Sequence, residues 1–105
     1  MILEASDGDT MLALKQIGSV RLLKNKFFRE VNQLEGTGAS PEELINLLGK
    51  GRARKGMLDG DLDDGELEIG QVSSLIKELK PAGEIVKEIM FDYQQALKQL
   101  TNSDL

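Results

Sequence analysis

Residues 40–48 read SPEELINLL and carry the clearest structural signal in the chain. Ser40 is a residue type that caps helices, and Pro41 suits the first helical position. Glu43 stands three residues after Ser40, where its side chain can complete a capping box. The aliphatic residues that follow give the segment an apolar side, and Gly49 is a typical helix stop. This stretch therefore predicts an amphipathic helix and points to a mostly helical fold.

The sequence before residue 40 predicts one more helix and two short strands. Apolar residues recur at helical spacing over 26–35, between Asn25 as the N-cap and Gly36 as the stop. Short apolar runs at 10–15 and 20–24 are bounded by turn residues and favour strands. Residues 1–25 are therefore expected to hold short strands and turns, and residues 26–48 two helices.

The sequence after residue 48 predicts a loop followed by two helices. Over 49–68 glycine recurs and the charge changes from basic to acidic, which is typical of an irregular, solvated loop. An apolar stripe from Ile69 to Leu79, ended by Pro81, and a longer one from Ile85 to Leu100 predict two helices over 69–100. The longer stripe is expected to lie in the core or to form a docking surface. Residues 101–105 are expected to fray.

These segments define one domain or fragment over residues 1–105. The predicted fold class is mostly α with a small strand-bearing N-terminal part (α+β) and about four helices. The chain has 105 residues, of which 40% are hydrophobic, and this is enough for one core but not for two.

The composition excludes several classes of function. The chain carries 13 Lys and Arg against 18 Asp and Glu, a net charge of −5, which opposes binding to nucleic acid or to an anionic membrane. It has no Cys and no His, so disulfides, thiolate nucleophiles and the commonest general base and metal ligands are absent. We expect no catalytic residue and no metal site in this chain. The absence of a signal-like start or a long apolar run indicates a cytoplasmic location.

Two charged stretches are candidate binding sites. Acidic residues at 59, 61, 63 and 64 resemble the start of a calcium loop, but Asp64 occupies the position where glycine is needed and Gly70 the position of the bidentate Glu. Calcium-dependent regulation is therefore the weakest hypothesis. The basic residues of the loop lack the spacing of a phosphate loop, and contact with a phosphate on a larger partner is an alternative to a solvated surface. These residues are Lys50, Arg52, Arg54 and Lys55.

Four blocks of sequence follow one another along the chain: GSVRLLKNK at 18–26, GASPEE at 38–43, GDLDDGELEIGQV at 60–72 and KPAGEIV at 80–86. In this order they resemble the C-terminal region of the nitronate monooxygenase (2-nitropropane dioxygenase-like) family. That family includes the flavin-dependent type II enoyl-acyl-carrier-protein (enoyl-ACP) reductases of bacteria. The resemblance extends from about residue 7 to residue 98.

The resemblance implies a fold, a chemistry and a site. Members are FMN-dependent oxidoreductases built on a (β/α)₈ barrel, so this chain resembles the last third of such an enzyme. In the complete enzyme FMN and NAD(P)H would take part, with reduction of an enoyl thioester or oxidation of a nitronate. The positions implied to approach the flavin or substrate are Glu68, Ile69, Gly70 and Gln71. The family more often has Met or Ser-Ala before Gly-Gln, where this chain has Glu68 and Ile69.

Two functional hypotheses follow. The first is a C-terminal domain or fragment of such an oxidoreductase, inactive and without a cofactor when alone, that contributes lid and packing surface to the flavin site. Its partner would be the remainder of the barrel enzyme or a second copy of the chain. The alternative is a stand-alone helical module for protein interaction or self-association, without catalysis.

Overall fold

The computed structural model describes residues 1–102. Its elements are η1 (Ile2–Glu4), β1 (Thr10–Ala13), β2 (Val20–Leu23), α1 (Lys26–Gly36), α2 (Pro41–Leu48), α3 (Arg52–Met57), η2 (Gln71–Leu75) and α4 (Ala82–Thr101). η1 and η2 are short 3₁₀ helices. The expectation of a mostly α chain with a small strand-bearing N-terminal part is confirmed.

The two strands form an antiparallel hairpin near the N-terminus. Thr10 pairs with Leu23 and Ala13 with Val20, at the two ends of the register. Residues 67–69 extend this small sheet on the other side of β2, because Leu23 N donates to Leu67 O at 3.0 Å and Ile69 N donates to Arg21 O at 3.1 Å. The sheet itself has two strands, and β2 is paired on its other edge through an isolated antiparallel bridge between Leu22 and Glu68. Residues 67–69 are called the third strand below.

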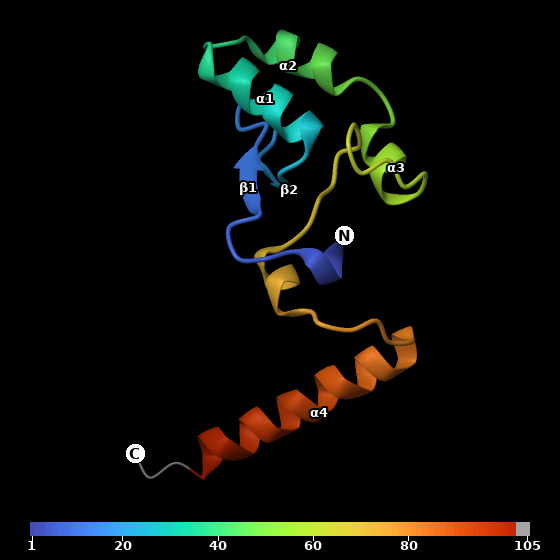
Figure 1. Ribbon diagram of the computed structural model, residues 1–105. Coiled ribbons are helices and arrows are strands. Elements are labelled where there is room, and N and C mark those ends of the chain that lie inside the picture. Colours follow the sequence, from blue (N-terminus) through green and yellow to red (C-terminus); the bar gives the residue numbers. More distant parts are fainter. Residues whose placement is uncertain (103–105) are drawn as a thin grey trace.

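The core lies between the hairpin and the first two helices. α1 packs against β1 and α2, as Figure 1 shows in its upper part. The buried side chains of this core are Ala13, Leu14, Leu22, Phe27, Phe28, Val31 and Leu44. They come from both strands, both helices and the hairpin loop, so burial of their apolar surface fixes these elements to one another.

The predicted helix ends at residues 25 and 40 are confirmed. Asn25 Oδ1 accepts from Phe28 N at 2.9 Å and caps α1. Ser40 Oγ accepts from Glu43 N at 3.3 Å, while Glu43 Oε2 accepts from Ser40 N at 2.7 Å, which closes the capping box of α2. The end of α1 lies slightly later than predicted, because Gly36 is still helical and Thr37 is the C-cap.

The segment 49–68, predicted as a loop, contains the short helix α3. Gly51, at φ 73°, precedes Arg52 as the N-cap, in a left-handed conformation that glycine adopts without strain. Gly56 lies inside α3, where its missing side chain leaves room for Leu67 and the backbone of Glu66. The glycines that indicated a loop therefore serve a helix end and a close helix contact.

The predicted helix from Ile69 to Leu79 is wrong. Only Gln71–Leu75 is helical, as the 3₁₀ helix η2, and Ile76 is already extended at φ −82° and ψ 119°. Ser73 and Ser74 fall in the middle of the segment, and serine competes with helical backbone hydrogen bonds. The apolar side chains Val72, Leu75 and Leu79 are exposed. A longer helix here would therefore not be stabilised by burial of its apolar side.

The helix α4 lies apart from the core. Figure 1 shows it at the bottom, joined to η2 by an extended stretch. Pro81 is its N-cap rather than its first residue, and no residue of α4 is buried in the described chain. The radius of gyration is 18.0 Å, against about 13 Å for a compact domain of this length. The apolar stripe of this helix is thus not part of the core.

The expected fraying of residues 101–105 falls largely outside the described residues, since only Thr101, in α4, and Asn102 are described.

Candidate functional site

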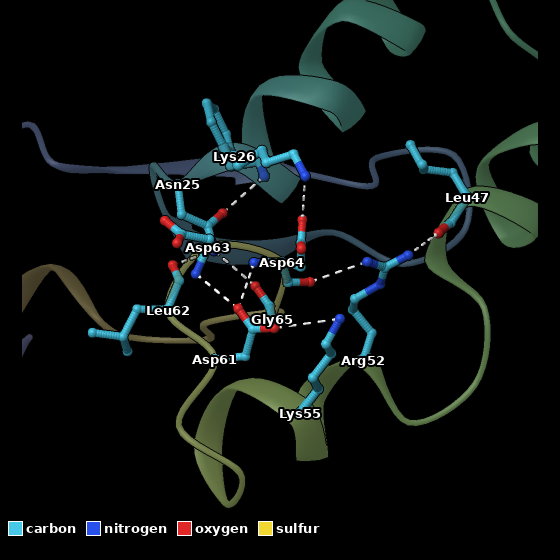
Figure 2. A network of polar contacts seen from close by, with 11 residues as sticks. Asn25, Lys26, Leu47, Arg52, Lys55, Asp61, Leu62, Asp63, Asp64 and Gly65 are labelled. Atoms are coloured by element: carbon cyan, nitrogen blue, oxygen red, sulfur yellow. Dashed lines mark hydrogen bonds and ion pairs between the residues drawn. The ribbon is translucent and has the colours of Figure 1, made fainter.

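The segment 61–71 is held against the core by a network of polar contacts. Figure 2 shows the side chain of Asn25 directed at the turn over residues 62–65. Asn25 Nδ2 donates to Leu62 O at 3.0 Å and to Gly65 O at 2.8 Å. One side chain therefore caps α1 and also holds the chain that leads into the third strand.

Asp61 shapes the acidic turn from within. Its Oδ1 accepts from Asp64 N at 2.9 Å and from Asp63 N at 3.1 Å, while Lys55 Nζ lies 3.3 Å from its Oδ2. The hydrogen bond from the Asp64 backbone, followed by those from Asp63 and Lys55, lowers the pKa of Asp61. Among residues 1–102 no group of three or more acidic side chains is placed to hold a metal ion.

Arg52 joins three parts of the chain. Its Nε donates to Leu48 O at 3.1 Å, Nη2 to Leu47 O at 2.6 Å and Nη1 to Asp64 O at 3.1 Å. The guanidinium carbon also lies 4.7 Å from the centre of the Phe27 ring. The Arg52 guanidinium is thus used to satisfy carbonyls at the end of α2 and in the acidic turn. Asp64 also pairs with the start of α1, with Lys26 Nζ 2.9 Å from Asp64 Oδ1.

Two glycines let α3 and the acidic turn meet at backbone distance. A Cβ added to Gly65 would collide with Gly56 Cα and Asp61 O, and would lie 2.6 Å from Gly56 N. Side chains are excluded from both positions for this reason. The contact sets where the chain turns toward residues 66–71.

The pair Glu66 and Glu68 lies along the third strand, on either side of Leu67. Leu67 is buried, and so is Glu66, whereas Glu68 is exposed. Burial, followed by a hydrogen bond with the Glu68 side chain and repulsion from its charge, raises the pKa of Glu66 to about 7, and the positive charge of Arg52 opposes that rise. Below that pH the protonated Glu66 carboxyl keeps charge out of its buried position.

The four residues implied by the family resemblance lie at the exit from this strand. Glu68 and Ile69 continue the pairing with β2, and Gly70 and Gln71 begin η2. Ile69 is half-buried, while Glu68, Gly70 and Gln71 are exposed. These residues form one continuous surface strip on a segment whose position is fixed by the sheet and by the Asn25 and Arg52 contacts.

Local sequence patterns do not identify Glu66, Asn25 and Arg52 as a connected group. The alternation Glu66-Leu67-Glu68 was the available signal, because a strand that buries Leu67 directs both glutamates to its other face. Nothing local in the sequence could have connected Asn25 to Gly65, since they are 40 positions apart.

Together these features define the fold as a mostly helical unit with a small sheet and an uncovered C-terminal helix. The fold is similar to part of a longer protein, FabK from Thermotoga maritima, in two solved structures. One of these matches with a TM-score of 0.79 and 29% identity, over 95% of this chain and 32% of FabK. The structure of the M276A mutant of the same protein matches with a TM-score of 0.68 and 26% identity, over 95% of this chain and 28% of that one.

The match covers nearly the whole chain but only about a third of FabK. The chain therefore has the fold of a fragment of a FabK-like enzyme, which agrees with the resemblance to the last third of a barrel enzyme. No family model and no curated protein sequence matches the chain. None of the described helices has the length and apolar content needed to cross a membrane.

Proposed function

We propose that this chain is the C-terminal portion of an FMN-dependent oxidoreductase of the enoyl-ACP reductase type. The observation that carries the proposal is the match to FabK, an enzyme of this type, over 95% of the chain and 32% of FabK. The order of the four sequence blocks supports the same assignment independently. Within the family, oxidation of a nitronate is the alternative activity. The chain would be inactive alone and would serve as lid and packing surface beside the flavin.

The residues at the exit of the third strand fit the ring of a flavin better than its phosphate. Gly70 is uncrowded, with Val72 Cγ1 3.8 Å from an added Cβ, so its backbone is accessible to a flat ligand. Gln71 adds an amide that can donate and accept hydrogen bonds. Glu68 and Glu66 lie just before them, and carboxylates repel a phosphate. We therefore assign ring and substrate contacts to residues 68–71 and phosphate binding to the rest of the enzyme.

In this proposal the bound FMN would supply hydride transfer from NAD(P)H. The chain would position the flavin ring or the substrate and exclude water from them. Ile69, half-buried between the sheet and η2, places an apolar group next to Gly70. The sheet pairing of Ile69 N with Arg21 O fixes where Gly70 and Gln71 lie. These residues would orient the ring or substrate without taking part in proton transfer.

The test is reconstitution of the enzyme from two parts. The chain alone, titrated with FMN, should show no change in flavin fluorescence and should not oxidise NADH. Co-expressed with the part of Thermotoga maritima FabK that it does not match, it should yield a complex that retains FMN and oxidises NADH. An enoyl thioester and an alkyl nitronate, supplied in parallel, would distinguish the two activities. Tight FMN binding and NADH oxidation by the chain alone would contradict the proposed division of roles.

The role of Gln71 has its own matched control. Gln71→Ala should lower FMN retention or turnover in the reconstituted complex, because the amide at the proposed ring contact is lost. Gln33→Ala, on the exposed side of α1, should leave both unchanged. Equal values for the two variants would remove Gln71 from the site.

The second candidate function is a stand-alone module for protein interaction or self-association. The uncovered apolar side of α4 is the observation that favours it. Light scattering at high protein concentration tests it, since a module that pairs with itself should give at least a dimer. A monomer at high concentration would count against self-association.

A further inference from the structure

The helix α4 carries an apolar stripe that nothing in the described chain covers. We define the α4 stripe as Val86, Ile89, Met90, Tyr93 and Leu97, whose exposed fractions lie between 46% and 61%. These positions share one side of the helix at spacings of three and four residues. In proteins most of the stability of an amphipathic helix comes from packing of its apolar side. The stripe therefore needs a partner surface.

A cleft continues the stripe toward the rest of the chain. It has a volume of about 510 Å³ and lies between η2 and the start of α4, with Leu75, Ile76 and Ile85 among its lining residues. Lys80 bridges across it, with its Nζ 2.9 Å from Glu78 Oε1 and 2.5 Å from Glu88 Oε2. These ion pairs fix the start of α4 to the preceding stretch while the apolar surface stays open.

The position of α4 is shared with FabK. The match to FabK leaves out 5% of this chain, which is about five residues, whereas α4 has 20. Most of α4 is therefore included in the match to a chain about three times as long. Among the described residues, no side chain of α4 is buried, so in FabK the additional chain is the available source of buried contacts.

We propose that the α4 stripe and the adjoining cleft pack against the part of a FabK-like chain that these 105 residues do not contain. The inference rests on the proposed function and names the surface through which the two parts join. The five residues of the stripe are each about half exposed, which together gives an apolar surface on the order of a few hundred Å², the size of a typical functional patch on a monomer. A stable complex buries about 800 Å² on each partner, so the stripe can form the apolar centre of such an interface. The partner surface must be apolar opposite the stripe.

The test compares two aromatic residues on opposite sides of α4. Tyr93 and Phe91 are 59% and 60% exposed, and two helical positions place their side chains about 160° apart. The full chain, tagged, is co-expressed with the complementary part of Thermotoga maritima FabK, and the recovered complex is measured by light scattering. The unchanged chain should give a one-to-one complex. Tyr93→Asp should reduce the recovered partner at least tenfold, whereas Phe91→Asp should change it less than twofold.

Several results would overturn the proposal. Failure of the unchanged chain to recover the partner would do so, and so would equal loss with both variants. A homodimer that Tyr93→Asp dissociates would assign the stripe to a second copy instead. Retention of FMN separates this proposal from the proposed function. A Tyr93-dependent complex without FMN refutes only the function, and an FMN-bound complex that tolerates Tyr93→Asp refutes only the surface.

Discussion

Replacement of Gly65 by alanine tests the contact that places the candidate site. The added Cβ would meet only backbone atoms, namely Gly56 Cα, Gly56 N and Asp61 O. Backbone cannot move aside as the end of a flexible side chain does, so α3 and the acidic turn must separate. The same shift would lengthen the hydrogen bond from Asn25 Nδ2 to Gly65 O, which is 2.8 Å in the native chain.

The expected loss of stability follows from these two effects. Overpacking of a closed contact costs about 1–3 kcal/mol, and weakening a buried hydrogen bond adds about 1 kcal/mol. The free energy of unfolding should therefore fall by about 2–4 kcal/mol. For a domain of this size that corresponds to a decrease in Tm of about 10–20 °C.

Urea and thermal unfolding followed by circular dichroism measure this loss. Gly36→Ala is the matched control, because nothing lies within 4 Å of its added Cβ and the residue is helical. That variant should be as stable as the native chain or slightly more stable. A Gly65→Ala chain within about 0.5 kcal/mol of the native one, the range of neutral surface substitutions, would refute the close backbone contact.

Three further variants test the network around the site. Asn25→Ala should lower the free energy of unfolding, measured in urea, by about 2–3 kcal/mol, because the cap of α1 and the hydrogen bonds to two carbonyl groups are lost. An unchanged free energy of unfolding would show that the side chain does not serve both as cap and as partner of the acidic turn. Arg52→Lys should lower the free energy of unfolding by about 1–3 kcal/mol in the same assay, because one ammonium group cannot reach three carbonyl groups in different directions. A variant as stable as the native chain would show that these three hydrogen bonds do not stabilise the fold. Glu66→Gln should flatten the pH dependence of stability. The folded pKa of about 7 exceeds the ordinary 4.5, so the contribution of Glu66 is complete below pH 4.5 and is lost as the pH rises through 7. Urea unfolding of the native and the Glu66→Gln chain at a series of pH values from about 4 to 8 measures this difference. If the free energy of unfolding changes with pH equally in both chains, the raised pKa of Glu66 is excluded.

The local signals of the sequence predicted the elements whose ends are determined locally. Asn25 and Ser40 cap helices through contacts three residues away, so their roles could be inferred from neighbouring residues alone. The region around Gly56 and Gly65 could not be predicted in this way. There glycine marks a contact between segments, and glycine alone does not distinguish a contact from a loop.

The segments after residue 68 show the limit of apolar periodicity. Residues 69–79 and 85–100 both have helical spacing, but only the second forms an α-helix of that length. α4 is rich in good helix formers such as Ala, Glu, Lys, Gln and Leu, whereas the earlier segment has two serines and ends before Pro81. The candidate site followed from family resemblance, and its support by Asn25 and Arg52 depends on contacts between distant positions.

The pairing of β2 with both neighbours has a consequence for the order of folding. β1 lies close to β2 in the sequence, so the hairpin closes with little loss of chain entropy, but Glu68 is 46 positions after Leu22. The sheet therefore cannot be completed until that late segment has been synthesised, and this long-range closure should limit the folding rate. α4 is synthesised after that segment. Its apolar side chains thus emerge when the hairpin, α1 and α2 are already available to bury one another, which limits their opportunity to enter the wrong core.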